Sequence, residues 1–195
     1  MLNHIKGELV EKTPTYAVVE CSGTGYLLNI SLNTYTKLPG SGSCKVFTEQ
    51  MYVRDDLPRL FGFADIQERQ LFRHLVSVSG VGGTSAIMML SSLSAQEIQQ
   101  AILSGNVAVL KSIKGIGEKT AQRIIVDLKG KLGKSDLSPD FMTVPYNNTR
   151  EEALSALVML GFAKNTAEKA LDKIIKDSPS AHNVEDLIKA ALKNL

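Results

Sequence analysis

Ser77-Val78-Ser79-Gly80-Val81-Gly82-Gly83-Thr84-Ser85-Ala86 and, 35 residues further on, Ser112-Ile113-Lys114-Gly115-Ile116-Gly117-Glu118-Lys119-Thr120-Ala121 are two versions of one pattern. In both, Gly-apolar-Gly precedes small or polar residues and then alanine, with helix-like sequence on either side. This arrangement predicts a helix-hairpin-helix. A single glycine motif matches by chance, and a turn joining two packed helices explains one copy equally well. Repetition of the unit favours a repeated use.

The hairpin pattern predicts a site for phosphate groups. Glycine allows positive φ and close approach of another backbone. The helix that follows exposes unpaired N–H groups and the positive end of its dipole. The apolar residue between the glycines can point inward and lock the turn to its helices. We therefore expect duplex DNA to be bound by Gly80, Val81, Gly82, Gly83 and Thr84 in the first copy, and by Gly115, Ile116, Gly117, Glu118, Lys119, Thr120 and Arg123 in the second.

Charge is concentrated near the second copy. The formal net charge of the chain is only +2. Between Lys111 and Lys134, however, there are seven basic residues and two acidic ones. A basic stretch at a phosphate-shaped site is expected of backbone binding, although a solvated helix face gives the same pattern.

The remaining composition bears on location and chemistry. No apolar run approaches a membrane span, and the N-terminus lacks the apolar core of a signal peptide, so we expect a cytoplasmic protein without a membrane partner. Cys21 and Cys44 form no CxxC motif, and the histidines are scattered, so no metal site is expected. No P-loop spacing and no Ser/His/Asp or Cys/His arrangement stands out. We therefore expect neither a cofactor nor catalysis by this chain.

The first 63 residues read as short strands separated by glycine-rich turns. Candidate strands cover residues 5–10, 16–20, 26–30, 44–53 and 59–63, rich in Val, Ile, Tyr and Phe. Five strands in so short a segment predict a small OB-like barrel over residues 1–63.

From residue 64 the pattern becomes helical. We expect helices at 67–78, 85–90, 94–103, 107–113 and 119–132, which place the tandem hairpins in a domain of residues 64–132. Ser94 and Glu97 have the spacing of a capping box.

The last third of the chain is predicted to be a linker and a small domain. Residues 133–148 are Ser/Pro/Asn-rich, and Pro139 and Pro145 disfavour regular structure, which predicts a flexible linker. Residues 149–195 predict three short helices, at 149–160, 165–176 and 184–195, with a cap at Thr149. Their apolar faces make either a compact core or a partner groove.

Asp55 and Asp56 lie side by side between the last two candidate strands. Acids on a DNA-binding surface repel phosphate, so their placement makes sense if repulsion excludes backbone from one spot and guides strands around it. The alternative is an Asp-rich turn, because Asp bonds readily to its own local backbone.

The ordered set of motifs resembles the RuvA family over essentially the whole length. The pin loop at Arg54-Asp55-Asp56, the segments Leu60-Phe61-Gly62-Phe63, Glu68-Arg69 and Leu71-Phe72, both hairpins, and the tail from Glu152-Ala153-Leu154 to Leu160-Gly161-Phe162 match that family. Two positions depart from it. Thr84 stands where the family often has Lys, and the pin is Asp-Asp where Glu-Asp is familiar.

The resemblance implies a Holliday-junction-binding subunit of a branch-migration helicase complex, acting in DNA recombination and repair. It implies tetramers, two of which can sandwich an open, square-planar junction as an octamer, with Asp55 and Asp56 as the acidic pin near its centre. It implies a small UBA-like tail domain that binds a RuvB-type AAA+ ATPase, to which we assign Leu154, Leu157, Leu160 and Phe162. A RuvC-type resolvase is a further implied partner.

Two other functions are compatible with parts of the pattern. Helix-hairpin-helix DNA glycosylases use a hairpin Lys and a downstream Asp, for which Lys119 and Asp136 have a suitable spacing. Asp136 falls in the predicted linker, and the chain lacks Trp to line a base pocket. A generic OB-type nucleic-acid binder would need a stacking platform, which Tyr16, Tyr26, Tyr35, Phe47 and Tyr52 could supply if they are not core residues.

Overall fold

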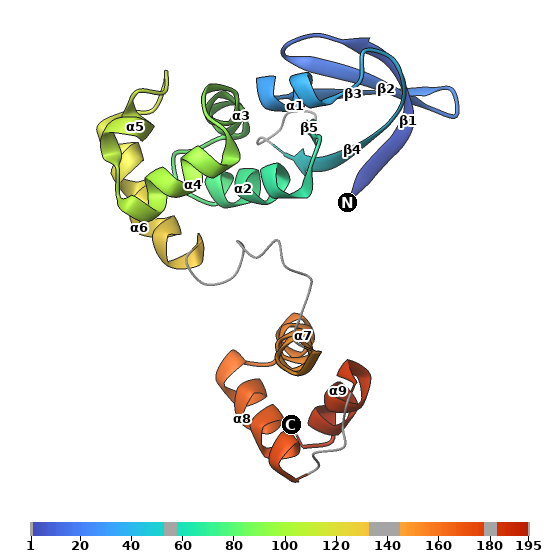
Figure 1. Ribbon diagram of the computed structural model, residues 1–195, viewed down its shortest axis with the longest axis vertical. Helices are drawn as coiled ribbons and strands as arrows, with labels where there is room; N and C mark the ends of the chain where they lie inside the picture. The colour runs from blue at the N-terminus through green and yellow to red at the C-terminus, as the bar shows by residue number, and fades with distance from the viewer. Residues whose placement is uncertain (1, 53–57, 133–144, 178–182, 195) are drawn as a thin grey trace. The chain divides into compact units, whose positions relative to one another are not determined.

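The computed structural model describes residues 2–52, 58–132, 145–177 and 183–194. The chain divides into two compact units, residues 1–137 and 138–195. The first unit holds a β-barrel and both hairpins, and the second holds the C-terminal helices (Figure 1).

Five strands form the barrel at the start of the first unit. They are β1 (His4–Lys12), β2 (Tyr16–Cys21), β3 (Thr24–Ile30), β4 (Gly42–Met51) and β5 (Arg59–Phe63). The sheet closes in the order β1-β2-β3-β5-β4, and β1 pairs with β4. All neighbours are antiparallel except β3 and β5, which are parallel. The predicted OB-like barrel is confirmed, although β4 begins two residues earlier than expected.

Side-chain alternation explains why these segments are strands. Successive residues of a strand point to opposite faces, so every second residue reaches the barrel interior. The interior is filled by Ile5, Leu9, Ala17, Val19, Leu28, Ile30, Leu38, Cys44 and Val46, all buried.

A short helix, α1 (Leu32–Lys37), follows β3 and was not expected from the sequence. The Ser31 side chain caps it by accepting a hydrogen bond from the Thr34 backbone N–H. Six residues with few good helix formers make a weak local signal, so tertiary contacts have to hold this helix.

Five helices complete the first unit: α2 (Ile66–Val76), α3 (Gly83–Ser92), α4 (Ala95–Ser104), α5 (Val107–Lys111) and α6 (Glu118–Leu132). The predicted capping box of Ser94 and Glu97 at the start of α4 is confirmed. The helices share a core with β5, because Phe61 and Phe63 pack against Phe72 of α2 with ring centroids 4.9 and 5.0 Å apart. Strand β5 therefore joins the barrel to the apolar core of the helical part.

The second unit contains α7 (Pro145–Met159), α8 (Lys164–Asp177) and α9 (Val184–Leu192). Two expectations need correction here, because α7 begins at Pro145 and not at Thr149. Proline is tolerated in the first turn of a helix, where its missing N–H has no partner to lose. Residues 145–148 thus belong to α7 and not to a linker, and Thr149 is not a cap.

The apolar faces of α7, α8 and α9 form a core of their own, built from Ala153, Leu157, Ala167, Leu171, Ile174, Leu187 and Ala191. Of the two alternatives for these faces, the compact core is the one observed. None of the helices in the described part of the chain, α1 to α9, is long and apolar enough to cross a membrane.

Candidate nucleic-acid interface

The first hairpin (residues 77–82) joins α2 to α3. Gly80 has φ +93°, a left-handed conformation that favours glycine. The Val81 N–H donates to the Val78 carbonyl at 3.0 Å, and the side chains of Val78 and Val81 are both buried. The turn is thereby locked to the core by its apolar residues, while Gly82 stays exposed.

The second hairpin (residues 112–117) joins α5 to α6 with the same geometry. Gly115 has φ +90°, and the Ile116 N–H donates to the Ile113 carbonyl at 3.0 Å. The side chains of Ile113 and Ile116 are buried and Gly117 is exposed. Equal geometry at a spacing of 35 residues supports a true structural repeat. The inward orientation expected for Val81 and Ile116 is observed, so these two residues can meet DNA only through their backbone.

Each hairpin leads directly into a helix N-terminus. Gly82 is the N-cap of α3 and makes no side-chain capping bond. The Ala86 and Ala121 N–H groups start the helical ladders by donating to the Gly82 and Gly117 carbonyls at 2.9 Å. Early N–H groups of a helix have no intrahelical acceptor and carry the positive end of the dipole. Both helix starts therefore have the chemistry of an anion site.

Exposed cations surround the second hairpin. Lys114, Lys119 and Arg123 are exposed, and among the described residues neither lysine has an acidic partner. Glu118 pairs with Lys111 at 3.1 Å, and its assignment to DNA binding stays a prediction. This ion pair lowers the repulsion that a free carboxylate would exert on phosphate. Lys114 is a further cation beside this hairpin. It is not among the residues predicted to bind DNA, although the sequence places it in the basic stretch and directly before Gly115.

Arg123 links α6, the helix after the second hairpin, to the first hairpin. From α6, its Nη1 donates to the carbonyl of Ser79 in the first hairpin, at 3.4 Å. The contact ties the first hairpin to the helix that begins at the second hairpin. Two phosphate sites at a fixed separation suit two points along one nucleic-acid backbone.

The two repeats differ in charge and size at the two positions after Gly-apolar-Gly, which are Gly83 and Thr84 in the first and Glu118 and Lys119 in the second. Gly83 is buried against the barrel, where an added Cβ would lie 2.5 Å from Cζ of Phe61 and 3.1 Å from Sδ of Met51. Its counterpart Glu118 is exposed. Gly83 is therefore a packing contact between α3 and the barrel, and its assignment to DNA binding through the backbone stays a prediction.

Thr84 is exposed and lines a groove of about 430 Å³ between α3 and the barrel. Lys119 takes the equivalent place in the second repeat and is also exposed. The first hairpin thus offers a neutral hydroxyl where the second offers a charge.

Comparison with known proteins adds the family. A model described as the RuvA N terminal domain matches residues 1–62, one described as a SAM-like helix-hairpin-helix tandem matches 72–130, and one described as the RuvA C-terminal domain matches 148–195. A protein of Christiangramia forsetii named "Holliday junction branch migration complex subunit RuvA" is 50% identical over 196 residues, which cover 100% of both chains. Proteins of the same name from Flavobacterium psychrophilum and Bacteroides fragilis are 49% and 47% identical, again over 100% of both chains. The chain belongs to the RuvA family.

The acidic pair assigned to the RuvA-family pin, Asp55 and Asp56, lies outside the described residues. So does Asp136, on which the glycosylase alternative depends. Both assignments stay predictions.

The aromatic residues considered for a stacking platform are largely occupied by packing. Tyr26 and Tyr35 pack against the barrel core, and Phe47 packs against the helical core. The Tyr16 hydroxyl donates to Glu11, and Tyr52 is exposed. Three of the five side chains thus pack against a core, which is the role considered for most of them.

The four residues predicted to contact the RuvB-type ATPase, which acts as the motor, occupy different environments in the C-terminal unit of this RuvA-family chain. Leu157 is fully buried, and Leu154 and Phe162 are partly buried against the same core. Leu160 is 60% exposed, and its neighbour Met159 is 87% exposed. Both side chains lie at the end of α7, just before Gly161, which has φ +99°. Of the four predicted residues, Leu160 is therefore the one most accessible to a partner. Met159 is also accessible, although it is not among the residues predicted from the sequence.

Proposed function

We propose that this chain binds the four-way Holliday junction and serves as the non-catalytic DNA-binding subunit of a branch-migration complex. The observation that carries the proposal is the pair of equivalent hairpins, each leading into a helix N-terminus and both held in one core, with Arg123 of α6 in contact with the first. Full-length relatives carry the name of that complex subunit. Contacts to phosphate carry little base information, so binding is weakly dependent on sequence.

The partners proposed for the complex follow the same logic. A RuvB-type ATPase supplies the ATP-driven motion and docks on the C-terminal unit, where Met159 and Leu160 are exposed. Copies of this chain assemble as a tetramer, or as two tetramers around one junction, because four arms require several pairs of hairpins. A RuvC-type resolvase acts on the same junction, and the complex works in the cytoplasm.

Asp55 and Asp56 are proposed as the pin that keeps strands apart at the junction centre. Because the side chains act by repelling phosphate, Asp55→Asn with Asp56→Asn should retain junction binding and alter branch migration in a reconstituted assay with the motor. Asn keeps the size of each side chain and removes its charge. Migration at the wild-type rate would rule out the pin role.

The proposed function is tested by titrating the purified chain against a synthetic four-way junction and against a linear duplex built from the same arms. Both titrations use the same near-physiological salt, since backbone binding depends steeply on salt. A large preference for the junction supports the proposal. Equal affinity would leave a general helix-hairpin-helix DNA binder.

A further inference from the structure

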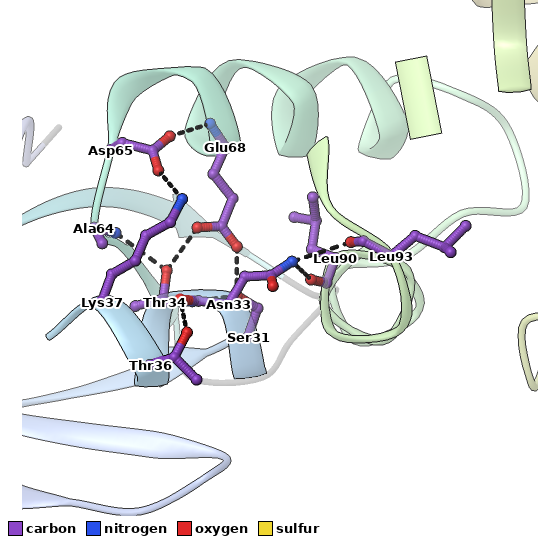
Figure 2. Close-up of polar contacts among 10 residues, drawn as sticks. All are labelled: Ser31, Asn33, Thr34, Thr36, Lys37, Ala64, Asp65, Glu68, Leu90 and Leu93. Carbon is purple, nitrogen blue, oxygen red and sulfur yellow. Dashed lines mark hydrogen bonds and ion pairs between the residues drawn. The ribbon is translucent and has the colours of Figure 1, made fainter. Parts of the chain in front are cut away.

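Helix α1 leaves the barrel after β3 and contacts two helices of the hairpin-bearing part (Figure 2). Toward α2, the hydroxyls of Ser31 and Thr34 donate to the two carboxylate oxygens of Glu68, the second at 2.7 Å. Lys37 forms an ion pair with Asp65, the N-cap of α2, at 2.6 Å. The first of these contacts is buried, so α1 and α2 are tied together away from water.

Toward α3, the link is the side-chain amide of Asn33. Its Nδ2 donates to the carbonyls of Leu90 and Leu93, at 2.6 and 3.0 Å. Both carbonyls lie at the C-terminal end of α3, where helix carbonyls lack intrahelical partners. The Leu32 N–H adds a bond to the Ser91 hydroxyl at 3.1 Å. One polar side chain thus satisfies two groups that would otherwise need water.

The opposite end of α3 is also fixed to the barrel. Gly83, its first residue, lies against the Phe61 ring so closely that no side chain fits there. The helix that begins at the first hairpin is therefore held at its start by β5 and at its end by α1. Two separated contacts fix the direction of a helix, whereas one contact leaves it free to pivot.

We propose that Asn33 is a positioning residue for junction recognition, because it fixes the direction of α3 and thereby of the first hairpin relative to the barrel. This inference rests on the proposed function. A four-way junction presents its arms in set mutual directions, so several copies can hold it together only if each copy keeps its hairpins at one angle. A linear duplex needs the hairpins of one copy, and those are held by the helical core without Asn33.

The test compares junction and duplex affinity for Asn33→Ala and Asn33→Asp in the full chain. Alanine removes both donors, and aspartate keeps the shape but turns an oxygen toward two carbonyls. Asn33 is half-buried, so both variants are expected to fold. Loss of two hydrogen bonds of ordinary net strength should lower junction affinity about tenfold, with duplex affinity changed less than about twofold.

Two further variants separate positioning from stability. Thr36→Ala removes a hydrogen bond from the Thr36 hydroxyl to the Asn33 carbonyl on the same helix, with no partner in α3, and should leave the ratio of junction to duplex affinity unchanged. Ser91→Ala removes the acceptor of the Leu32 N–H and should lower the ratio in the same direction as Asn33→Ala, by a smaller factor. A purely stabilising role for Asn33 would instead lower both affinities together, or neither.

Energy transfer between two fluorophores measures the orientation of the helical part relative to the barrel. The fluorophores are attached to cysteines introduced by Val10→Cys in β1 and Val126→Cys in α6, two exposed positions, in a chain that also carries Cys21→Ser. Labelled chains are diluted into unlabelled chains, so that transfer occurs within one chain. The energy-transfer distribution should broaden in Asn33→Ala and stay narrow in Thr36→Ala. An unchanged distribution or an unchanged affinity ratio would overturn the positioning role. If the wild-type chain does not bind the junction more tightly than the duplex, the proposed function is overturned. The role of Asn33 in junction recognition is then overturned as well, whatever the energy-transfer distribution shows.

Discussion

Glu68 is a buried carboxylate whose hydrogen-bond partners are hydroxyls (Figure 2). Burial raises the pKa of Glu68, because a charge is less well solvated inside the protein than in the unfolded chain; the bonds from Ser31 and Thr34 oppose this shift only in part. Ionised Glu68 therefore costs stability at neutral pH.

The pH dependence of unfolding should reveal this cost. The pKa is higher in the folded chain, so the contribution of Glu68 is most favourable below its ordinary pKa of 4.5 and declines as pH rises through the folded-state pKa. Glu68→Gln cannot ionise. Urea unfolding of both chains from pH 4.5 to 7 should show the free energy of unfolding of the wild type, minus that of the variant, falling as pH rises. A flat or rising difference would contradict the assignment.

The side chains at Thr84 and Lys119, equivalent positions of the two repeats, should set the salt dependence of DNA binding. Lys119→Ala should weaken binding to junction and duplex alike and reduce the slope of log affinity against log salt by about 0.9, because one phosphate contact is lost. Thr84→Lys should strengthen binding and raise the slope by about 0.9. Titrations at several salt concentrations measure both, and Thr36→Ala serves as the control. Equal slopes in all four chains would mean that neither position contacts phosphate.

At the scale of the element, the glycines of one hairpin have different duties. Gly115 has positive φ, whereas Gly117 does not, and an added Cβ at Gly117 would meet open space. Gly115 is thus required by the turn itself. The absence of a side chain at Gly117 leaves room for another backbone beside the start of α6.

Alanine substitutions should separate these duties. Gly115→Ala should destabilise the chain by about 1–2 kcal/mol, because a side chain in the left-handed region is strained. Gly117→Ala should change stability by less than about 1 kcal/mol but weaken DNA binding, because its methyl group would hold the phosphate away. Thermal unfolding and duplex titration give the two quantities. Full DNA affinity in Gly117→Ala would show that the backbone is not approached there.

An element can be predicted from sequence when contacts between residues close along the chain stabilise it, and not when contacts with distant residues do. The hairpins were predictable because Gly80 and Gly115 are required by local backbone geometry. Helix α1 was not, because its stability comes from Glu68 and Leu90, which lie far along the chain. Pro145 predicts a break in regular structure from sequence alone, because a first-turn proline and a loop proline look alike without the helix boundary.

The site was predictable in its chemistry and less so in its contacts. Lys119 and Thr120 were assigned by position in the repeat. That Gly83 packs against Phe61, and that Arg123 reaches Ser79, depends on the arrangement of elements distant in sequence. For the same reason, Leu157 was assigned to a partner surface although it is buried: a short apolar helix does not show which of its residues face its own core.

At the scale of the whole molecule, the chain consists of two units with separate cores. The hairpins and the barrel belong to the first, and the exposed side chains of Met159 and Leu160 belong to the second. Because no residue of one core is shared with the other, the activities assigned to the two units should be separable.

Removal of residues 138–195 should leave junction binding unchanged and abolish stimulation of the motor ATPase. In the full chain, Met159→Ser with Leu160→Ser should reduce stimulation without loss of helix content, because both side chains are exposed. The matched control is Val126→Ser, an equally apolar and exposed site in the first unit. Junction titration, circular dichroism and ATP hydrolysis by the motor give the readouts. Full stimulation by the shortened chain would place the motor contact in the first unit.

The close approach of Gly83 to Phe61 also constrains how this chain can change through evolution. A methyl group at position 83 would overlap the Phe61 ring, so a substitution there is tolerated only together with a smaller residue at position 61. The two positions, 22 residues apart in sequence, should therefore vary as a pair among relatives. In a laboratory selection, Phe61→Leu should arise as a compensating mutation for Gly83→Ala. Paired substitutions at these two positions in related sequences would therefore mark the contact between the barrel and the helix that follows the first hairpin.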